Sequence, residues 1–194
     1  MVELAIVAVL AFLLGSVPFG LLIVRAWGLG DLRQIGSGNI GATNVLRTGS
    51  KTAALLTLIL DVGKGAFAVL LARWYLGETA AQLAGVGAFL GHCYPIWLRF
   101  KGGKGVATFL GTVLALSWPV GLAVCATWLI SAFATRISSL SALIAAALAP
   151  LYALWWAGWP LAVGVAAMAA LIFLRHRGNI ARLRVGTEPR IGRK

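Results

Sequence analysis

Charged residues are scarce in this chain of 194 residues: only 11% are Asp, Glu, Lys or Arg, and only five residues are acidic. Soluble domains carry about a quarter charged residues, whereas 60% of this chain is hydrophobic. Apolar runs of about 18 residues or more recur along it, and such runs are typical of membrane-spanning helices. The composition therefore excludes an ordinary soluble domain. It predicts an integral membrane protein in which residues 1–194 form a single polytopic membrane domain.

Cysteine and histidine are also rare, with two of each. Cys93 and Cys125 lie in or near apolar segments and lack the spacing of metal ligands. No Ser-His-Asp or Cys-His set occurs at a recognisable spacing. Trp97, not aspartate, stands five positions after His92, so the His-Asp motif of soluble-domain acyltransferases is absent. We therefore expect no nucleophilic triad, no metal ion and no cofactor.

Apolar segments, by contrast, fill most of the chain. Seven can be delimited, near residues 4–26, 53–76, 80–98, 105–116, 120–135, 139–156 and 159–174. The fourth is short for about 30 Å of hydrocarbon, and the break at Ser117–Trp118–Pro119 could be a kink in one longer helix, so six spans are the alternative. The first run has Glu3 in place of a positive leader, and we expect it to remain as a span. The prediction is an all-α integral membrane protein, a bundle of seven transmembrane helices.

Basic residues mark one side of this bundle. Of the 17 lysines and arginines, 15 fall in the odd-numbered loops and the C-terminal tail, while Arg73 flanks the other side and Lys64 lies within a span. The positive-inside rule then puts the N-terminus outside and the C-terminus in the cytoplasm. The net charge of +12 also suits contact with anionic membrane lipid. Nucleic-acid binding is not expected, because the charges are spread over short membrane loops.

The first polar segment on the cytoplasmic side is "GSGNIGATNVLRTG", residues 36–49. Its glycines allow tight turns whose backbone N–H groups can form an anion-binding nest. Hydrogen-bonding side chains accompany them: Ser37, Asn39, Thr43, Asn44 and Arg47. A flexible connector would have a similar composition, but it would not need so many donors.

The second is "FKGGKGVATFLG", residues 100–111. Gly102 and Gly103 let the backbone approach a ligand, and Lys104 comes just before a helix expected to begin near Val106. A helix N-terminus favours an anion, and Thr108 could add a hydroxyl. The segment is not a Walker A loop, since no Ser or Thr follows the lysine directly. The alternative is a basic loop that snorkels to the membrane surface.

Two charged residues lie inside the second apolar segment. Asp61 and Lys64 are three residues apart and so share one helix face. Charges within a span are costly and indicate function by default, although a mutually paired structural salt bridge is an equal alternative. His92, at the end of the third segment, is either a packed histidine or a base.

The last polar segment is "RHRGNIARLRVGTE", residues 175–188, with Asn179, Arg182 and Glu188. A solvated basic tail is its alternative interpretation. Taken with the other loops, it suggests several anion-binding segments around the cytoplasmic ends of the bundle. The predicted ligand carries phosphate and has an apolar part in the bilayer.

The motifs "GSGNIGATNVLR", "LDVGKG", "GHCYPIWLRFKGGKGVAT", "RISSLSA" and "HRGNIARLRVGTE" occur in this order over residues 36–188. Together they closely resemble the bacterial acyl-phosphate:glycerol-3-phosphate acyltransferases, the PlsY family. The resemblance implies a multi-pass enzyme of the bacterial cytoplasmic (inner) membrane, with its active site facing the cytoplasm. It implies transfer of a fatty acyl group from acyl phosphate to position 1 of glycerol 3-phosphate. The products would be lysophosphatidic acid and phosphate, the first step of phospholipid synthesis, and a partner enzyme would supply the acyl phosphate.

The resemblance also assigns roles to residues. The expected catalytic residues are Lys104, Ser37, Arg47 and His92. The expected substrate-binding residues are Asn39, Thr43, Asn44, Gly102, Gly103, Thr108, Ser139, Ser141, Asn179, Arg182 and Glu188, with Asp61 and Lys64 in support. Lys104 and the nearby amides would hold a phosphate, while His92 or the acyl phosphate's own oxygens would accept the hydroxyl proton. Because acyl phosphate is already activated, positioning and charge stabilisation can replace a triad.

A transporter of a phosphorylated or other small anion is the main alternative function. It too would use basic, glycine-rich loops and charges within a span. Against it, the outer loops offer few polar groups and the sequence has no internal repeat. A structural protein that binds anionic lipid headgroups is a third interpretation, but it would not need ordered Asn, Ser and Thr beside the glycines.

Overall fold

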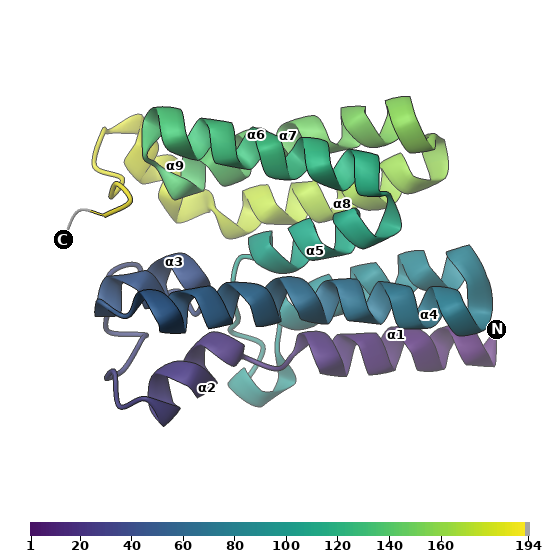
Figure 1. Ribbon diagram of the computed structural model, residues 1–194, viewed down its shortest axis with the longest axis horizontal. Helices are drawn as coiled ribbons and strands as arrows, with labels where there is room; N and C mark the ends of the chain where they lie inside the picture. Colours follow the sequence, from purple (N-terminus) through teal and green to yellow (C-terminus); the bar gives the residue numbers. More distant parts are fainter. Residues whose placement is uncertain (193–194) are drawn as a thin grey trace. The chain divides into compact units, whose positions relative to one another are not determined.

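The computed structural model describes residues 1–192, and every regular element in that range is helical (Figure 1). The helices are α1 (Val2–Gly15), α2 (Phe19–Ala26), α3 (Ala42–Val45), α4 (Lys51–Cys93), α5 (Val106–Leu116), α6 (Trp118–Thr135), α7 (Ser138–Ala157), α8 (Trp159–Arg175) and α9 (Arg177–Arg184), with 3-10 turns η1 (Leu46–Thr48) and η2 (Ile96–Leu98). The predicted all-α class is confirmed. The chain divides into two compact units, Met1–Leu116 and Ser117–Lys194.

Helix α4 is a hairpin of two antiparallel arms. Its 43 residues would extend about 65 Å if straight, but Gly77 has non-helical dihedrals, φ 78° and ψ −167°. Asp61 and His92, about 45 Å apart along a straight helix, lie with Oδ1 and Nδ1 only 3.6 Å apart. Figure 1 shows α4 turning back at its far end. Alanines from both arms join one buried cluster: Ala68, Ala72, Ala80, Ala84 and Ala88. The segments expected at 53–76 and 80–98 are thus the two arms.

The first apolar segment is two helices instead of one. Helix α1 ends at Gly15 and α2 begins at Phe19, with Pro18 between them; proline lacks the N–H that would continue the helix. Helix α1 lies very close to the second arm of α4, because a methyl group at Gly15 or Gly91 would overlap backbone of the other helix. Small residues permit such close contacts between membrane helices.

Helix α5 packs against the first arm of α4 in the same way. A methyl group at Gly111 would overlap the carbonyl of Val62, and one at Gly65 would meet the carbonyl of Thr108. At its other end, Arg73 donates to the carbonyl oxygens of Ala115 and Leu116, at 2.6 and 3.0 Å. A cation at the last carbonyls stabilises a helix C-terminus. These contacts fix α5, and with it the loop that precedes it.

In the second unit, α6, α7 and α8 are joined by short turns. The α6–α7 turn contains Arg136, at φ 58°, and the α7–α8 turn contains Gly158, at φ 81°. The tail after α9 returns to the first of these turns, where the Ile191 N–H donates to the Arg136 carbonyl at 2.6 Å. The basic tail therefore lies at the Arg136 end of this unit.

Within residues 1–192, four helical stretches are long and apolar enough to cross a membrane: Val2–Ala26, Lys51–Leu98, Trp118–Thr135 and Ser138–Ala157. Helices α8 and α9, bent by 61° at their junction, form a fifth if taken together. Large apolar side chains are exposed on these stretches, Phe133 at 92% for example, as expected where lipid is the solvent. The multi-pass membrane character predicted from composition is confirmed.

Candidate functional site

Asn44 organises the loop between α2 and α4. It is 1% exposed, and its amide nitrogen donates to the carbonyl oxygens of Leu32 and Ile35, at 3.0 and 2.9 Å. Its Oδ1 accepts from the backbone N–H of Ser37 at 3.1 Å. Both amide hydrogens of Asn44 are thus used within the loop, so this residue, expected to bind substrate, serves to shape the loop.

Arg47 and Ser37 both contact the side-chain oxygen of Asn44. The Arg47 guanidinium donates to Asn44 Oδ1 at 3.1 Å, and the Ser37 hydroxyl lies 3.5 Å from that oxygen. Gly36, at φ +54°, leaves room for the arginine, since a methyl group there would lie 2.6 Å from its side chain. A guanidinium has five N–H donors, so one bond inside the loop leaves others for a ligand. Asn39 and Thr43 are half-buried in the same loop.

The glycine loop, residues 101–105, is fastened to the end of α4. The Gly102 N–H donates to the Cys93 carbonyl at 3.2 Å, and the Gly103 N–H donates to the His92 carbonyl at 3.0 Å. These two amides, expected to face a phosphate, are thus hydrogen-bonded within the protein. Glycine is needed at both positions for the loop to pack against α4, because a side chain at either would overlap the end of that helix. Lys104 is half-buried in this loop, and Thr108 is fully buried in the first turn of α5.

A buried charge cluster joins the two arms of α4. Lys64 Nζ lies 2.8 Å from Asp61 Oδ1 and donates to the carbonyl of Val17 at 2.9 Å. The same carboxylate oxygen lies 3.6 Å from His92 Nδ1. The three side chains are between 1 and 4% exposed. The Asp61–Lys64 salt bridge, one of the two interpretations that the sequence left open, is present, and the structure adds His92 to it.

In the second unit, the Glu188 carboxylate accepts three hydrogen bonds. Its Oε1 accepts from the Ser139 hydroxyl at 2.7 Å and from the Asn179 amide, and its Oε2 accepts from Arg182 Nε at 2.7 Å. Four of the expected substrate-binding residues are therefore one cluster. The fifth in this unit, Ser141, is buried, and its hydroxyl donates to the Ile137 carbonyl one turn back.

The electrostatics of this cluster favour the ionised carboxylate. Burial by itself would raise the pKa of Glu188, but the hydrogen bonds from Ser139, Asn179 and Arg182, with the positive charge of Arg182, outweigh it and lower the pKa below its usual value. Glu188 is consequently an anion at neutral pH and cannot act there as a proton donor. Its part is to hold its three partners in place.

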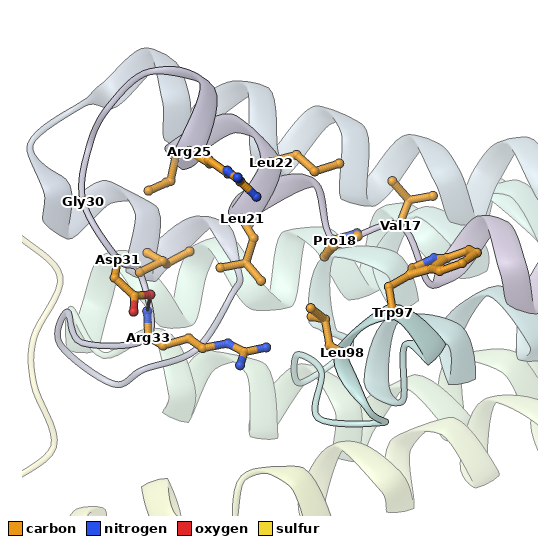
Figure 2. Close-up of a pocket in the computed structure, with 12 residues that line it drawn as sticks. Val17, Pro18, Leu21, Leu22, Arg25, Gly30, Asp31, Arg33, Trp97 and Leu98 are labelled. Atoms are coloured by element: carbon orange, nitrogen blue, oxygen red, sulfur yellow. Dashed lines mark hydrogen bonds between the residues drawn. The ribbon is translucent and has the colours of Figure 1, made fainter.

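Two features of the structure were not expected from the sequence. His176 is 2% exposed, with Nδ1 at 2.8 Å from the Ile172 carbonyl; its position in the motif "RHRGN" was the available signal. The other is a cavity of about 750 Å³ in the first unit, lined by Val17, Pro18, Leu21, Leu22, Val24, Arg25, Gly30, Asp31, Leu32, Arg33, Trp97 and Leu98 (Figure 2). No expected site residue lines it. Among residues 1–192, no group of three or more His, Cys, Asp or Glu side chains could hold a metal ion.

Comparisons with known proteins agree on one family. The profile of the family described as glycerol-3-phosphate acyltransferase matches residues 5–186. A glycerol-3-phosphate acyltransferase of Jannaschia sp. is 68% identical over 191 residues, covering 98% of this chain and 94% of that protein. One from Cereibacter sphaeroides is 62% identical over 194 residues, covering 100% and 92%.

Solved structures point the same way. The crystal structure of PlsY, an integral membrane glycerol 3-phosphate acyltransferase, in its glycerol 3-phosphate form matches with a TM-score of 0.91 and 41% identity, covering 98% of this chain and 96% of that one. The lysophosphatidic acid form matches with a TM-score of 0.89 and 40% identity, with the same coverage. The chain belongs to the glycerol-3-phosphate acyltransferase family.

Proposed function

We propose that the acyl donor of this membrane enzyme is a fatty acyl phosphate and that the acceptor is the position 1 hydroxyl of glycerol 3-phosphate. The chain is a glycerol-3-phosphate acyltransferase of the PlsY type, which forms lysophosphatidic acid. The observation that carries this conclusion is the family match over residues 5–186. It favours the acyltransferase over an anion transporter.

In the proposed reaction, the hydroxyl oxygen attacks the acyl carbonyl carbon. A carbon–oxygen ester bond forms, the bond between the acyl carbon and the phosphate oxygen breaks, and inorganic phosphate leaves. The hydroxyl proton ends on the departing phosphate, whose own oxygens can accept it. Phosphate is a good leaving group, so this chemistry needs charge stabilisation and alignment more than a strong acid.

Arg47 and Lys104 are the proposed phosphate-binding cations. Arg47 can hold a phosphate with two parallel N–H groups, and Asn44 keeps it beside Ser37. Lys104 stands in a loop fastened to α4 and precedes the N-terminus of α5, a favourable place for an anion. We further propose Asn39, Thr43 and Thr108 as neutral ligand groups, and Gly102 and Gly103 as the residues that let the loop pack closely.

The residues of the second unit are proposed for substrate binding too. Asn179 and Ser139 are held by Glu188, and Arg182 adds a positive charge to their cluster. Ser141 donates to a helix carbonyl, and we assign it a supporting part. Asp61 and Lys64 are proposed to support the site from within the membrane.

Seven spans, an outside N-terminus and a cytoplasmic C-terminus complete the proposal, within a single polytopic domain of the bacterial inner membrane. Seven spans require that both arms of α4, the short α5 and α8 cross the bilayer. Contacts between loops support this sidedness. In the first unit, Arg25 and Arg33 of the first loop line one cavity with Leu98, which precedes the third loop, so these two basic loops lie at the same end of the helices. In the second unit, the Arg136 carbonyl accepts a hydrogen bond from the Ile191 N–H, so the fifth loop and the basic tail also lie at one end. We also propose that a separate enzyme supplies the acyl phosphate.

The test is turnover by the purified protein in lipid, with labelled glycerol 3-phosphate and either palmitoyl phosphate or palmitoyl-CoA. Lysophosphatidic acid formed from the acyl phosphate alone is the expected result. Product from the CoA ester alone would overturn the donor, and a folded protein that uses neither donor would overturn the whole proposal.

A further inference from the structure

We propose that Asp61 is a positioning residue of this enzyme, which acts through His92 to fix the glycine loop and so the placement of Lys104. The inference rests on the proposed function of Lys104 as a phosphate ligand. It gives the buried charges of α4 a specific task in substrate binding, beyond neutralising each other.

His92 contacts the glycine loop through both its backbone and its ring. Its carbonyl accepts the Gly103 N–H at 3.0 Å. A methyl group at Gly103 would overlap ring atom Nε2 and come within 3.0 Å of Cδ2 and Cε1, so the imidazole lies directly against the Gly103 α-carbon. The orientation of this ring therefore determines where Gly103, and the lysine after it, can sit.

Asp61 lies at the opposite edge of the ring. Its Oδ1 lies 3.6 Å from Nδ1, so the ring stands between the carboxylate and the loop. Nε2 packs against Gly103 and His92 is 4% exposed, so the ring lies within the packing between α4 and the glycine loop. His92 is thus placed to transmit position, and the proton goes to the phosphate oxygens.

Lys64 completes the cluster and links it to the break between α1 and α2. It shares Asp61 Oδ1 with His92, at 2.8 Å, and holds the Val17 carbonyl at the break between α1 and α2. Its ammonium also lies 5.6 Å from the centre of the Phe19 ring. If Asp61 served only to neutralise Lys64, it would not need to contact His92 on the second arm of α4. Sharing the carboxylate with His92 is what extends the cluster to the glycine loop.

The test compares three variants of the full-length protein in lipid: Asp61→Asn, the double variant Asp61→Asn with Lys64→Met, and Thr57→Val. The double variant removes both buried charges together, so that no unpaired ammonium remains in the membrane. Thr57 is a matched control, because it is equally buried one turn before Asp61 and its hydroxyl only bonds the Ala53 carbonyl. Each is measured for kcat and for the KM of both substrates, with thermal unfolding as the check of folding.

We expect the KM of one phosphate substrate to rise about tenfold or more in both Asp61 variants, a loss of about 1.4 kcal/mol of binding. The kcat should change by less than about threefold, as expected when ground-state and transition-state binding are lost equally, and Thr57→Val should match the wild type.

Recovery of the wild-type KM in the double variant would show that Asp61 only neutralises Lys64 and would overturn the inference. A fall in kcat at unchanged KM would make His92 a chemical participant instead. Loss of folding in both Asp61 variants would also count against the proposal, since the cluster would then be structural. Lack of turnover by the wild type would refute the proposed function itself.

Discussion

The Glu188 cluster allows a substitution whose effect can be worked out atom by atom. In Glu188→Gln, the side-chain oxygen can still accept from Ser139 and Asn179, as Oε1 does now. The new NH₂ group then faces Arg182 Nε, which at present donates to Oε2 at 2.7 Å. Two donors would oppose each other. If the amide turns over, the NH₂ group opposes the Asn179 amide instead, so either orientation loses a bond.

The expected loss of stability in Glu188→Gln lies between that of a buried and that of an exposed ion pair. A hydrogen bond to a charged group contributes about 1.5–3 kcal/mol, and the Glu188 side chain is 5% exposed. The Arg182 side chain, at 40% exposure, can turn toward water, which reduces the cost. We therefore expect Glu188→Gln to lower the free energy of unfolding by about 1–2 kcal/mol at neutral pH, from these ranges.

The pH dependence has a definite sign. The pKa of Glu188 is lowered in the folded protein, below an ordinary value of about 4.3. Its stabilising contribution is therefore complete above the unfolded-state pKa and is lost as the pH falls through the folded-state pKa. The difference between wild type and Glu188→Gln should be constant near neutrality and shrink below about pH 4.3.

Thermal unfolding in detergent over a series of pH values measures this difference, at about 2–4 °C per kcal/mol for a chain of this size. Glu78→Gln is the control. Glu78 pairs with Arg73 at 2.8 Å, but the two side chains are 56% and 32% exposed, so its loss should cost about 1 kcal/mol or less. Equal stability of Glu188→Gln and wild type at neutral pH, or a gap that widens on acidification, would refute the reasoning.

Three further predictions concern the first unit. Lys104→Met should lower kcat/KM by about 10- to 100-fold, mainly by raising the KM of one phosphate substrate, because that substrate loses a charged ligand contributing about 1.5–3 kcal/mol, with little change in unfolding temperature; full activity in the acyl-phosphate assay would remove Lys104 from the site. Asn44→Ala should destabilise the loop by about 1–3 kcal/mol, because one buried and one part-buried carbonyl group lose their donor, and limited proteolysis should then cut the loop faster than in the wild type. Gly111→Ala should reduce the free energy of unfolding by about 1–3 kcal/mol, because the added methyl group overlaps the Val62 carbonyl. The control is Gly164→Ala in α8, where the methyl group meets only open space. This control should leave the unfolding temperature unchanged or raise it, because alanine favours the helix by about 1 kcal/mol over glycine.

Local spacing along the chain explains which parts of the site could be predicted. Asp61 and Lys64 are three residues apart on one helix, so their pairing follows from helix geometry alone, and the ion pair is present at 2.8 Å. Asn179 and Arg182, near Glu188 in sequence, both donate to its carboxylate; the motif placed these three residues together, although as substrate ligands and not as partners of one another. Such contacts need no knowledge of how distant segments pack.

Contacts between distant segments could not be predicted in this way. His92 reaches Asp61 only because α4 reverses at Gly77, and Ser139 reaches Glu188 only because the tail returns to the start of α7. The inward direction of Asn44 was also beyond sequence reasoning, because an amide suits a ligand and a buried loop equally well. Only the carbonyl groups of Leu32 and Ile35, packed beside it, decide the matter.

The sequence by itself determined the helical class, the membrane environment and the family, because each depends on composition, on the length of apolar runs or on short contiguous motifs. It also located the turn after residue 76 and the short helix that begins at Val106. The tertiary structure alone decided which polar groups are available to substrate. It committed the amides of Gly102 and Gly103 to α4 and placed His92 between Asp61 and the glycine loop. The physical reason is that a buried polar group bonds to whatever the packing brings within about 3 Å, and packing is a property of the whole fold.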